Sequence, residues 1–292
     1  MITSTGNARI KAVSALVKKA KLRREQKLFI VEGPKMFAEL PVSHLRETYV
    51  SESFIKQQGE RAERLLSGCR YEIVSDDVMK YMSDTQTPQG VLAVAEQFFY
   101  TLEKVLGGFG IAGAALAEGA GAADDAAHAE DAAAGNRQPP PHLMLLETLQ
   151  DPGNLGTILR AGEGAGITGV VMNEATADIY NPKVIRSTMG SIYRVPFVYV
   201  QDWKGAIEEI KSRGIRLYAA HLKGTGSYEE QDYTKPTGFF IGNEANGLTD
   251  ETADMADCYV KIPMAGKVES LNAAIAASVL MFETARQRRR NA

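Results

Sequence analysis

The stretch LETLQDPGNLGTILRAGEGAGITGVVMN, residues 146–173, decides the fold of the second half of the chain. It leads from an apolar strand through a tight turn into a helix, and then through glycines into the apolar run GVVM at 169–172. Pro152 and Gly153 suit the centre of a β-turn, and Asn154 is a favoured helix N-cap. Strand, helix and strand in this order are typical of a parallel βαβ unit.

Gly164, Gly166 and Gly169 spell the pattern GxGxxG within the same stretch. A dinucleotide-binding turn follows a strand and opens a helix, whereas these glycines close a helix and precede a strand. A helix C-cap followed by a short loop explains them better. The order of elements therefore argues against a nucleotide-dependent oxidoreductase.

More apolar runs extend the pattern, as expected for strands that are buried on both faces. They are LMLLE (143–147), GVVM (169–172), VPFVYV (195–200), RLYAA (216–220), GFFIG (238–242) and YVKI (259–262), with helical stretches between them. We therefore predict an α/β domain over residues 142–292, with a mainly parallel sheet and helices on both faces. Its last helix is expected from about 271 to 289.

A smaller α/β domain is predicted over residues 1–106. Helical stretches at about 7–20, 33–40 and 53–66 alternate there with β-rich runs at 27–31, 48–51, 71–74 and 90–96. Residues 107–141 are rich in Ala and Gly and end in three prolines. Because this segment has few large apolar side chains to offset the entropy of ordering, we predict a flexible linker between the domains.

The formal net charge of −3 hides a basic N-terminal stretch. Residues 1–27 contain one acid, Glu25, and eight basic residues: Arg9, Lys11, Lys18, Lys19, Lys21, Arg23, Arg24 and Lys27. This density favours contact with RNA phosphates, although a solvated helix face or a targeting peptide are alternatives.

The composition argues against metal and disulfide chemistry. Cys69 and Cys258 lie far apart, and the four histidines have no metal-ligand spacing. The sequence has no apolar run long enough to span a membrane and no secretory leader, so the cytoplasm is the expected location.

Three segments contain candidate functional residues at or near strand ends. Arg160 lies six residues after Asn154, in a helix that is otherwise apolar or small. Glu244 emerges at the carboxyl end of the strand GFFIG, two residues after it, and Gly242 permits close approach of a ligand to the backbone. A cap and an exposed turn acid are the structural alternatives for Asn154 and Glu244.

The third segment is VKIPMAGKVESLNAAIAASVLMFETARQR, residues 260–288, in which a strand and a loop lead into the last helix. Ser270 could simply be the helix N-cap. That alternative leaves Asn272 unexplained, because Asn is an indifferent residue in the first turn of a helix and needs a partner for its side chain.

Together, these segments resemble the three motifs of the SpoU/TrmH RNA ribose 2′-O-methyltransferases of the SPOUT superfamily. DPGNLGTILRAGEGAG resembles the first, IGNEANGL the second and IPMAGKVESLNAAIAASVLMFE the third, in the family's order. Residues 1–96, with STGNARIKAVSALVKK and FIVEGPKM, resemble the small substrate-binding domain of ribosomal-RNA members.

The resemblance implies an active site and a methyl donor. The catalytic residues would be Asn154, Arg160, Glu244, Ser270 and Asn272, and S-adenosylmethionine would lie near Gly242, Asn243, Ile262 and Leu271. It also implies a C-terminal trefoil knot, a homodimer and no metal. RNA, most simply rRNA, is the expected partner, with tRNA or an inactive RNA-binding relative as alternatives.

Under this hypothesis, Arg160 contacts the target hydroxyl and an adjacent phosphate, while Ser270 and Asn154 orient that hydroxyl. Glu244 anchors the turn and Asn272 ties the third motif to the site. Since a guanidinium stays protonated, we expect Arg160 to stabilise the developing alkoxide rather than to act as a base.

Overall fold

The computed structural model describes residues 1–107, 139–221, 224 and 226–291. Most of the predicted linker at 107–141 lies outside these residues. The C-terminal half forms a seven-stranded sheet in which every pairing is parallel. Its order is β7 (Phe197–Val200), β6 (Gly169–Asn173), β5 (His142–Leu146), β10 (Thr237–Ile241), β8 (Arg216–Ala220), β11 (Cys258–Lys261) and β9 (Gly226–Ser227). The predicted parallel α/β sheet is confirmed, and only the two-residue β9 was missed.

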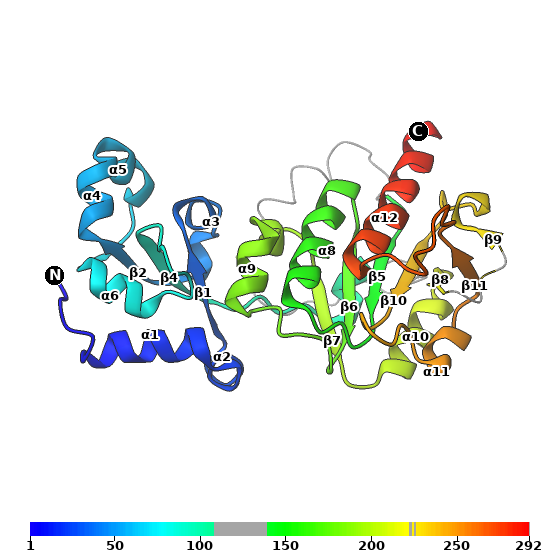
Figure 1. Cartoon of the computed structure of the whole chain (residues 1–292), viewed down its shortest axis with the longest axis horizontal. Coiled ribbons are helices and arrows are strands. Elements are labelled where there is room, and N and C mark those ends of the chain that lie inside the picture. Colours follow the sequence, from blue (N-terminus) through cyan, green and yellow to red (C-terminus); the bar gives the residue numbers. More distant parts are fainter. Residues whose placement is uncertain (108–138, 222–223, 225, 292) are drawn as a thin grey trace, which may run out of the picture.

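Helices cover both faces of this sheet (Figure 1). One face packs against α8 (Pro152–Ala165), α9 (Pro182–Thr188) and α12 (Ala273–Arg290), and the other against α7 (Leu102–Val105), α10 (Trp203–Ser212) and α11 (Asp250–Asp254). Neighbouring residues of a strand supply opposite cores, because side chains alternate along a strand. No helix in the described ranges is long and apolar enough to cross a membrane.

The start of α8 differs from the prediction. Asp151, not Asn154, is the N-cap, and its carboxylate accepts a hydrogen bond of 2.8 Å from the Asn154 amide. Pro152 occupies the first helical turn, where its missing N–H is not needed, so Pro152 and Gly153 belong to the helix rather than to a β-turn. The helix ends as predicted, with Gly166 in the left-handed conformation at φ 73°. Asn154 thus lies inside the first turn with its side chain free for other contacts.

The N-terminal half forms a four-stranded mixed sheet. Its order is β1 (Leu28–Glu32), β4 (Val91–Glu96), β2 (Leu45–Ser51) and β3 (Glu72–Val74); β4 is antiparallel to both neighbours, and β2 is parallel to β3. One face packs against α1 (Ala8–Lys18) and α6 (Asp76–Met82), and the other against α3 (Pro34–Ala38), α4 (Glu52–Gln58) and α5 (Glu60–Leu66). The predicted helix at 53–66 is two helices, because the chain turns at Gly59 with φ 47°.

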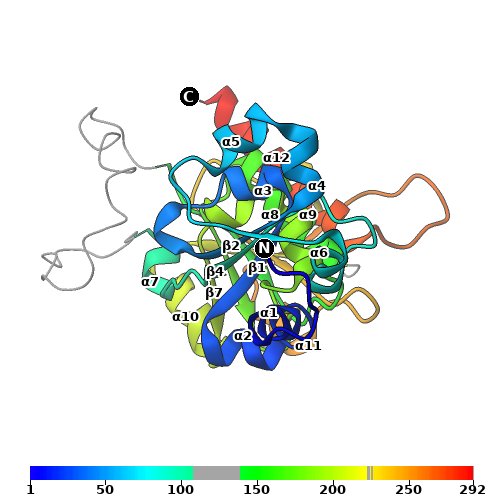
Figure 2. The ribbon, with the colours of Figure 1, turned by 90° about the vertical axis from the view of Figure 1, so that its left-hand side faces the viewer.

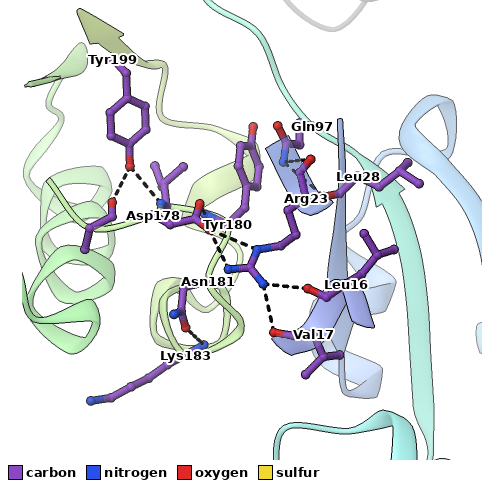
Figure 3. A network of polar contacts seen from close by, with 12 residues as sticks. Leu16, Val17, Arg23, Leu28, Gln97, Asp178, Tyr180, Asn181, Lys183 and Tyr199 are labelled. Atoms are coloured by element: carbon purple, nitrogen blue, oxygen red, sulfur yellow. Dashed lines mark hydrogen bonds and ion pairs between the residues drawn. The ribbon is translucent and has the colours of Figure 1, made fainter. Parts of the chain in front are cut away.

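A buried arginine joins the two sheets' domains (Figure 3). Arg23 follows α1 in α2 (Ala20–Gln26), and its side chain is only 3% exposed. Its guanidinium donates to Asp178 Oδ2 at 2.7 and 3.1 Å and to the carbonyls of Leu16 and Val17 at 2.7 and 3.0 Å. Because Asp178 precedes α9, this ion pair ties the first helices of the chain to the larger domain.

Two further arginines of the larger domain reach the smaller one. Arg186 pairs with Asp84 at 2.7 Å, and Arg194 pairs with Glu39 at 2.8 Å. One continuous apolar cluster runs beneath these pairs and contains residues from both sheets and from α3, α8, α9 and α12. Such a junction favours a fixed arrangement of the domains, which lie side by side in Figure 1.

Candidate active site

Three loops meet at the carboxyl edge of the parallel sheet. They follow β5, β10 and β11, and β5 and β10 are direct neighbours. A chain of side-chain hydrogen bonds links the loops: Asn272 Nδ2 donates to Asn154 Oδ1 at 2.9 Å, and Asn154 Nδ2 donates to Glu244 Oε1 at 3.0 Å. These two hydrogen bonds join residues that are separated by 118 and by 90 positions in the sequence. Ligands of open α/β sheets bind at this edge.

Glu244 also holds the loop that leads into α8. Its carboxylate accepts from the backbone N–H groups of Gln150 and Asp151, at 3.0 and 2.8 Å. Burial alone raises the pKa of the Glu244 carboxyl, but the hydrogen bonds from Gln150, Asn154 and Asp151 outweigh burial and hold that pKa below its usual value. The carboxylate is therefore charged at neutral pH and acts as the acceptor that fixes this loop.

Asn272 has two functions in the structure. It is the N-cap of α12, and its Oδ1 accepts from the amides of Ala274 and Ile275 at 2.9 and 3.3 Å. Its Nδ2 remains available for Asn154. The structure excludes the alternative explanation of Ser270 as the cap of this helix, because Ser270 lies two residues before the cap in the preceding loop.

Arg160 and Ser270 stay outside the hydrogen-bonded chain. Arg160 is exposed on α8, six residues after Asn154, and Ser270 is exposed in the loop at 262–272. Among the described residues, neither side chain has a hydrogen bond or ion pair to Asn154, Glu244 or Asn272. Both groups are thus open to a bound substrate or to another chain.

The turn after β10 is closely packed on itself. Asn243 pairs with Gly247 through two backbone hydrogen bonds of 2.9 Å, and its Nδ2 donates to the Thr148 carbonyl at 3.0 Å. A Cβ atom on Gly242 would lie 2.1 Å from the Gly247 carbonyl carbon. The glycine at 242 is therefore required by the chain's own turn, not only by a ligand.

The residues expected around the methyl donor fit such a molecule. Ile262 and Leu271 are partly buried apolar side chains at the two ends of the loop 262–272, which stands out from the domain in Figure 2. Backbone groups of this loop and of the turn at 242–247 lie outside helices and regular strands. An adenosyl group needs apolar contact for its ring and backbone donors and acceptors for its edges.

A second acidic anchor was not recognised in the sequence. Glu147, directly after β5, is 6% exposed and accepts from the Thr249 amide and hydroxyl at 2.8 and 2.7 Å, and from the Thr252 hydroxyl. Thr249 is the N-cap of α11. Glu147 thus fixes the far end of the turn that carries Glu244. An acid directly after an apolar strand was the available signal.

The basic N-terminal stretch is only partly available for RNA. Arg23 is buried at the junction, and Arg9 pairs with Glu47 and Glu72 at 3.2 and 3.1 Å. At the other end of the chain, Arg288 donates to four backbone carbonyls, and burial lowers its pKa to about 10. The structure therefore assigns some of these cations to folding.

Within the described ranges, no cluster of three or more His, Cys, Asp or Glu residues could hold a metal ion. The free thiols, Cys69 and Cys258, are both partly buried. The groups that face one another in the hydrogen-bonded chain are the amides of Asn154 and Asn272 and the carboxylate of Glu244, and Arg160 lies exposed on the same helix as Asn154. This set can bind and orient a hydroxyl and stabilise a developing negative charge.

Two protein families match the chain. The SpoU rRNA methylase family matches residues 141–282, and the MRM3-like substrate binding domain matches residues 7–93. An uncharacterized tRNA/rRNA methyltransferase of Synechocystis sp. is 30% identical over 98% of this chain and 93% of its own length. The 23S rRNA (guanosine(2553)-2′-O)-methyltransferase RlmP of Bacillus subtilis is 28% identical over 96% of this chain and 97% of its length.

Solved structures agree over both domains. The SpoU methyltransferase AviRb from Streptomyces viridochromogenes superposes with a TM-score of 0.77 and 26% identity, over 98% of this chain and 99% of that one. Its complex with the cofactor AdoMet gives a TM-score of 0.77 with 27% identity, over 97% and 98% of the two chains. With three motif loops meeting at one sheet edge, the chain belongs to the SpoU rRNA methylase family and is an S-adenosylmethionine-dependent RNA 2′-O-methyltransferase.

Proposed function

We propose that the chain methylates a ribose 2′-hydroxyl of ribosomal RNA, with residues 142–292 as the catalytic domain and 1–106 as the domain that selects the RNA. The observation that carries this proposal is the hydrogen-bonded chain from Asn272 through Asn154 to Glu244, which ties three loops into one rim. Ribosomal RNA is favoured because the matching family is an rRNA methylase family and RlmP acts on 23S rRNA. Transfer RNA is the second candidate, since several relatives are named tRNA/rRNA methyltransferases.

Each site residue has a proposed role. Arg160 faces the target hydroxyl and an adjacent phosphate, and its positive charge stabilises the oxygen as the proton leaves to phosphate or water. Ser270 and Asn154 orient the hydroxyl, Glu244 holds Asn154 and the loop before it, and Asn272 keeps the third motif in register. The bound donor supplies a methyl group that its sulfonium already activates. Alignment and charge stabilisation are then the work left to the protein.

Donor binding, topology and assembly complete the proposal. Gly242, Asn243, Ile262 and Leu271 border the donor, and the sheet contains the trefoil knot expected from the resemblance. A homodimer places residues of the partner near the exposed Arg160 and Ser270. The cytoplasmic location expected from the sequence stays a prediction.

The test compares Arg160→Ala and Arg160→Lys in a methylation assay with tritiated donor and deproteinised rRNA. We expect Arg160→Ala to lower kcat by about 10²- to 10³-fold, the loss typical of one group that stabilises a developing oxyanion. Donor affinity, measured by calorimetry, should not change. The matched control is Arg216→Ala, an exposed arginine at the amino end of β8, on the opposite edge of the sheet.

The two variants also separate charge from geometry. Arg160→Lys should recover part of the activity, because it keeps the charge but loses the planar pair of donors. Near-normal methylation by Arg160→Ala, with donor and RNA bound as in the wild type, would refute the catalytic role. Methyl transfer to tRNA but not to rRNA would replace the proposed substrate by the second candidate.

A further inference from the structure

We propose that a groove on the smaller domain, between α3, α4, α5 and residues 88–90, binds the phosphate backbone of the RNA substrate. This inference rests on the proposed function, because it names the surface with which the domain selects RNA. The groove has a volume of about 910 Å³. Figure 1 shows α3, α4 and α5 on one side of the small sheet and α1 on the other. The RNA contact predicted from the sequence lies on the α1 side, so the groove is a different surface.

The groove is a formed surface rather than a gap between loops. Gly90 lines the groove with φ of 83°, and Gly33, directly before the lining residue Pro34, has φ of 98°; L side chains rarely adopt this backbone conformation. A Cβ atom on Gly90 would lie 2.5 Å from Phe54 Cβ and 2.9 Å from Ser51 Oγ. Ser51 caps α4 by accepting from the Phe54 amide at 3.2 Å. The base of the groove is therefore packed tightly and keeps its shape without a ligand.

The charge of the lining favours an anion. Three cations line the groove, Lys35 from α3 and Arg61 and Arg64 from α5, and all three are exposed. Within the described part of the chain, none of them has an ion pair. The single acid of the lining, Glu39, is already paired with Arg194 across the domain junction at 2.8 Å. Cations that converge on a concave surface focus the field there and attract a polyanion.

The neutral lining residues suit a sugar-phosphate chain. Gln57, Gln58 and Gln89 add amide groups that can bind phosphate and ribose oxygens, whereas the Ser53 hydroxyl already donates to Asp76 at 2.6 Å. A single small anion would leave most of this volume empty, whereas a nucleic-acid strand presents a phosphate at each residue. The neighbouring hollow at Glu60, Glu63, Arg64 and Ser67 contains two acids and is less suited to phosphate. Because Arg64 borders both hollows, Lys35 and Arg61 give the cleaner test.

The experiment measures the affinity of the full chain for in-vitro-transcribed rRNA as a function of salt. Each lost phosphate contact reduces the slope of log K against log salt by about 0.7–0.9. For Lys35→Ala/Arg61→Ala we therefore expect the fall of log K with log salt to be less steep by about 1.5. The variant should thus bind much more weakly than the wild type at 50 mM salt, and this difference in affinity should be nearly tenfold smaller at 200 mM salt. Thermal unfolding checks that both variants fold, and Arg61→Gln alone should show half the change in slope.

The matched control is Arg70→Ala/Lys80→Ala, two exposed cations of the same domain that lie outside both the groove and the basic N-terminal stretch, with Lys80 on α6. It should bind RNA with the wild-type slope. A wild-type slope for Lys35→Ala/Arg61→Ala would overturn the proposal, as would an equal change of slope in the control pair. A wild-type chain that binds and methylates no rRNA would instead reject the proposed function itself.

Discussion

Glu244→Gln isolates what the charge at the rim contributes. The wild-type carboxylate accepts three hydrogen bonds within 3.0 Å, two from backbone amides of Gln150 and Asp151 and one from Asn154. A glutamine has nearly the same shape but offers one acceptor oxygen, and its amide would point two hydrogens at groups that are themselves donors. At least one donor of the loop 147–151 therefore loses its partner in the variant.

The expected cost follows from these contacts. A hydrogen bond to a charged acceptor contributes about 1.5–3 kcal/mol, and Glu244 lies at an exposed rim where water can replace part of the loss. We expect the free energy of unfolding to fall by about 1–2 kcal/mol. The larger effect should be on catalysis, since displacement of reacting groups by about 1 Å can reduce the rate about 10²-fold.

Urea unfolding and steady-state methylation of rRNA measure the two effects. Glu208→Gln, an exposed carboxylate on α10 away from the loops, is the matched control and should leave both unchanged. Unfolding of Glu244→Gln at the wild-type urea concentration, together with methylation at the wild-type rate, would show that the charge contributes to neither. Loss of stability with a full rate would limit Glu244 to a structural role.

Four further variants test the domain junction, the turn after β10 and the buried histidine of β5. Asp178→Asn should lower the free energy of unfolding by about 3–5 kcal/mol, because it leaves the buried Arg23 charge uncompensated. Arg23→Met should lower it by less, since Asp178 is 23% exposed and can regain water. Equal losses in urea unfolding would contradict this order. Gly242→Ala should lose donor binding by calorimetry and about 1–3 kcal/mol of stability, since its new methyl group would overlap the Gly247 backbone; wild-type binding would show that the turn adapts. Burial lowers the pKa of His142 to about 3, below the ordinary 6.5, because the folded state disfavours the protonated imidazole. The histidine therefore costs no stability above pH 6.5, and the free energy of unfolding falls by about 4–5 kcal/mol in total as the pH drops toward 3. His142→Leu should reduce the acid sensitivity of the melting temperature, and an unchanged profile would exclude this source.

The sheet and the gathering of the site loops could be predicted because they depend on long, regular patterns. Apolar runs buried on both faces gave the strands, and parallel strands bring their carboxyl ends to one edge. Asn154 and Glu244 follow two such strands closely, so their proximity is a consequence of topology. The strand β9 has two residues, which is too short for any periodicity to appear.

Local details could not be predicted because several residues satisfy the same physical need. Asp151 and Asn154 both suit an N-cap, and the choice depends on Pro152, which takes the first helical position when Asp151 is the cap. Ser270 and Asn272 pose the same choice at α12, where the added hydrogen bond to Asn154 favours Asn272. The cap of α8 is thus selected by a neighbouring proline, and the cap of α12 by a contact distant in sequence.

The hydrogen-bonded chain at the rim also fixes the direction of its own amides. An asparagine amide can point either way, but the helix end at Ala274 and Ile275 offers only donors, so Asn272 must turn its oxygen to α12 and its nitrogen to Asn154. The Glu244 carboxylate accepts only, so Asn154 must turn its nitrogen there and its oxygen to Asn272. Both ends impose the same orientation. An aspartate at position 154 or 272 would replace the donating Nδ2 by an oxygen and so place two acceptor oxygens against each other. The start of α12 is therefore coupled to the loop before α8, and a change that frays this helix end should disturb the site without touching it.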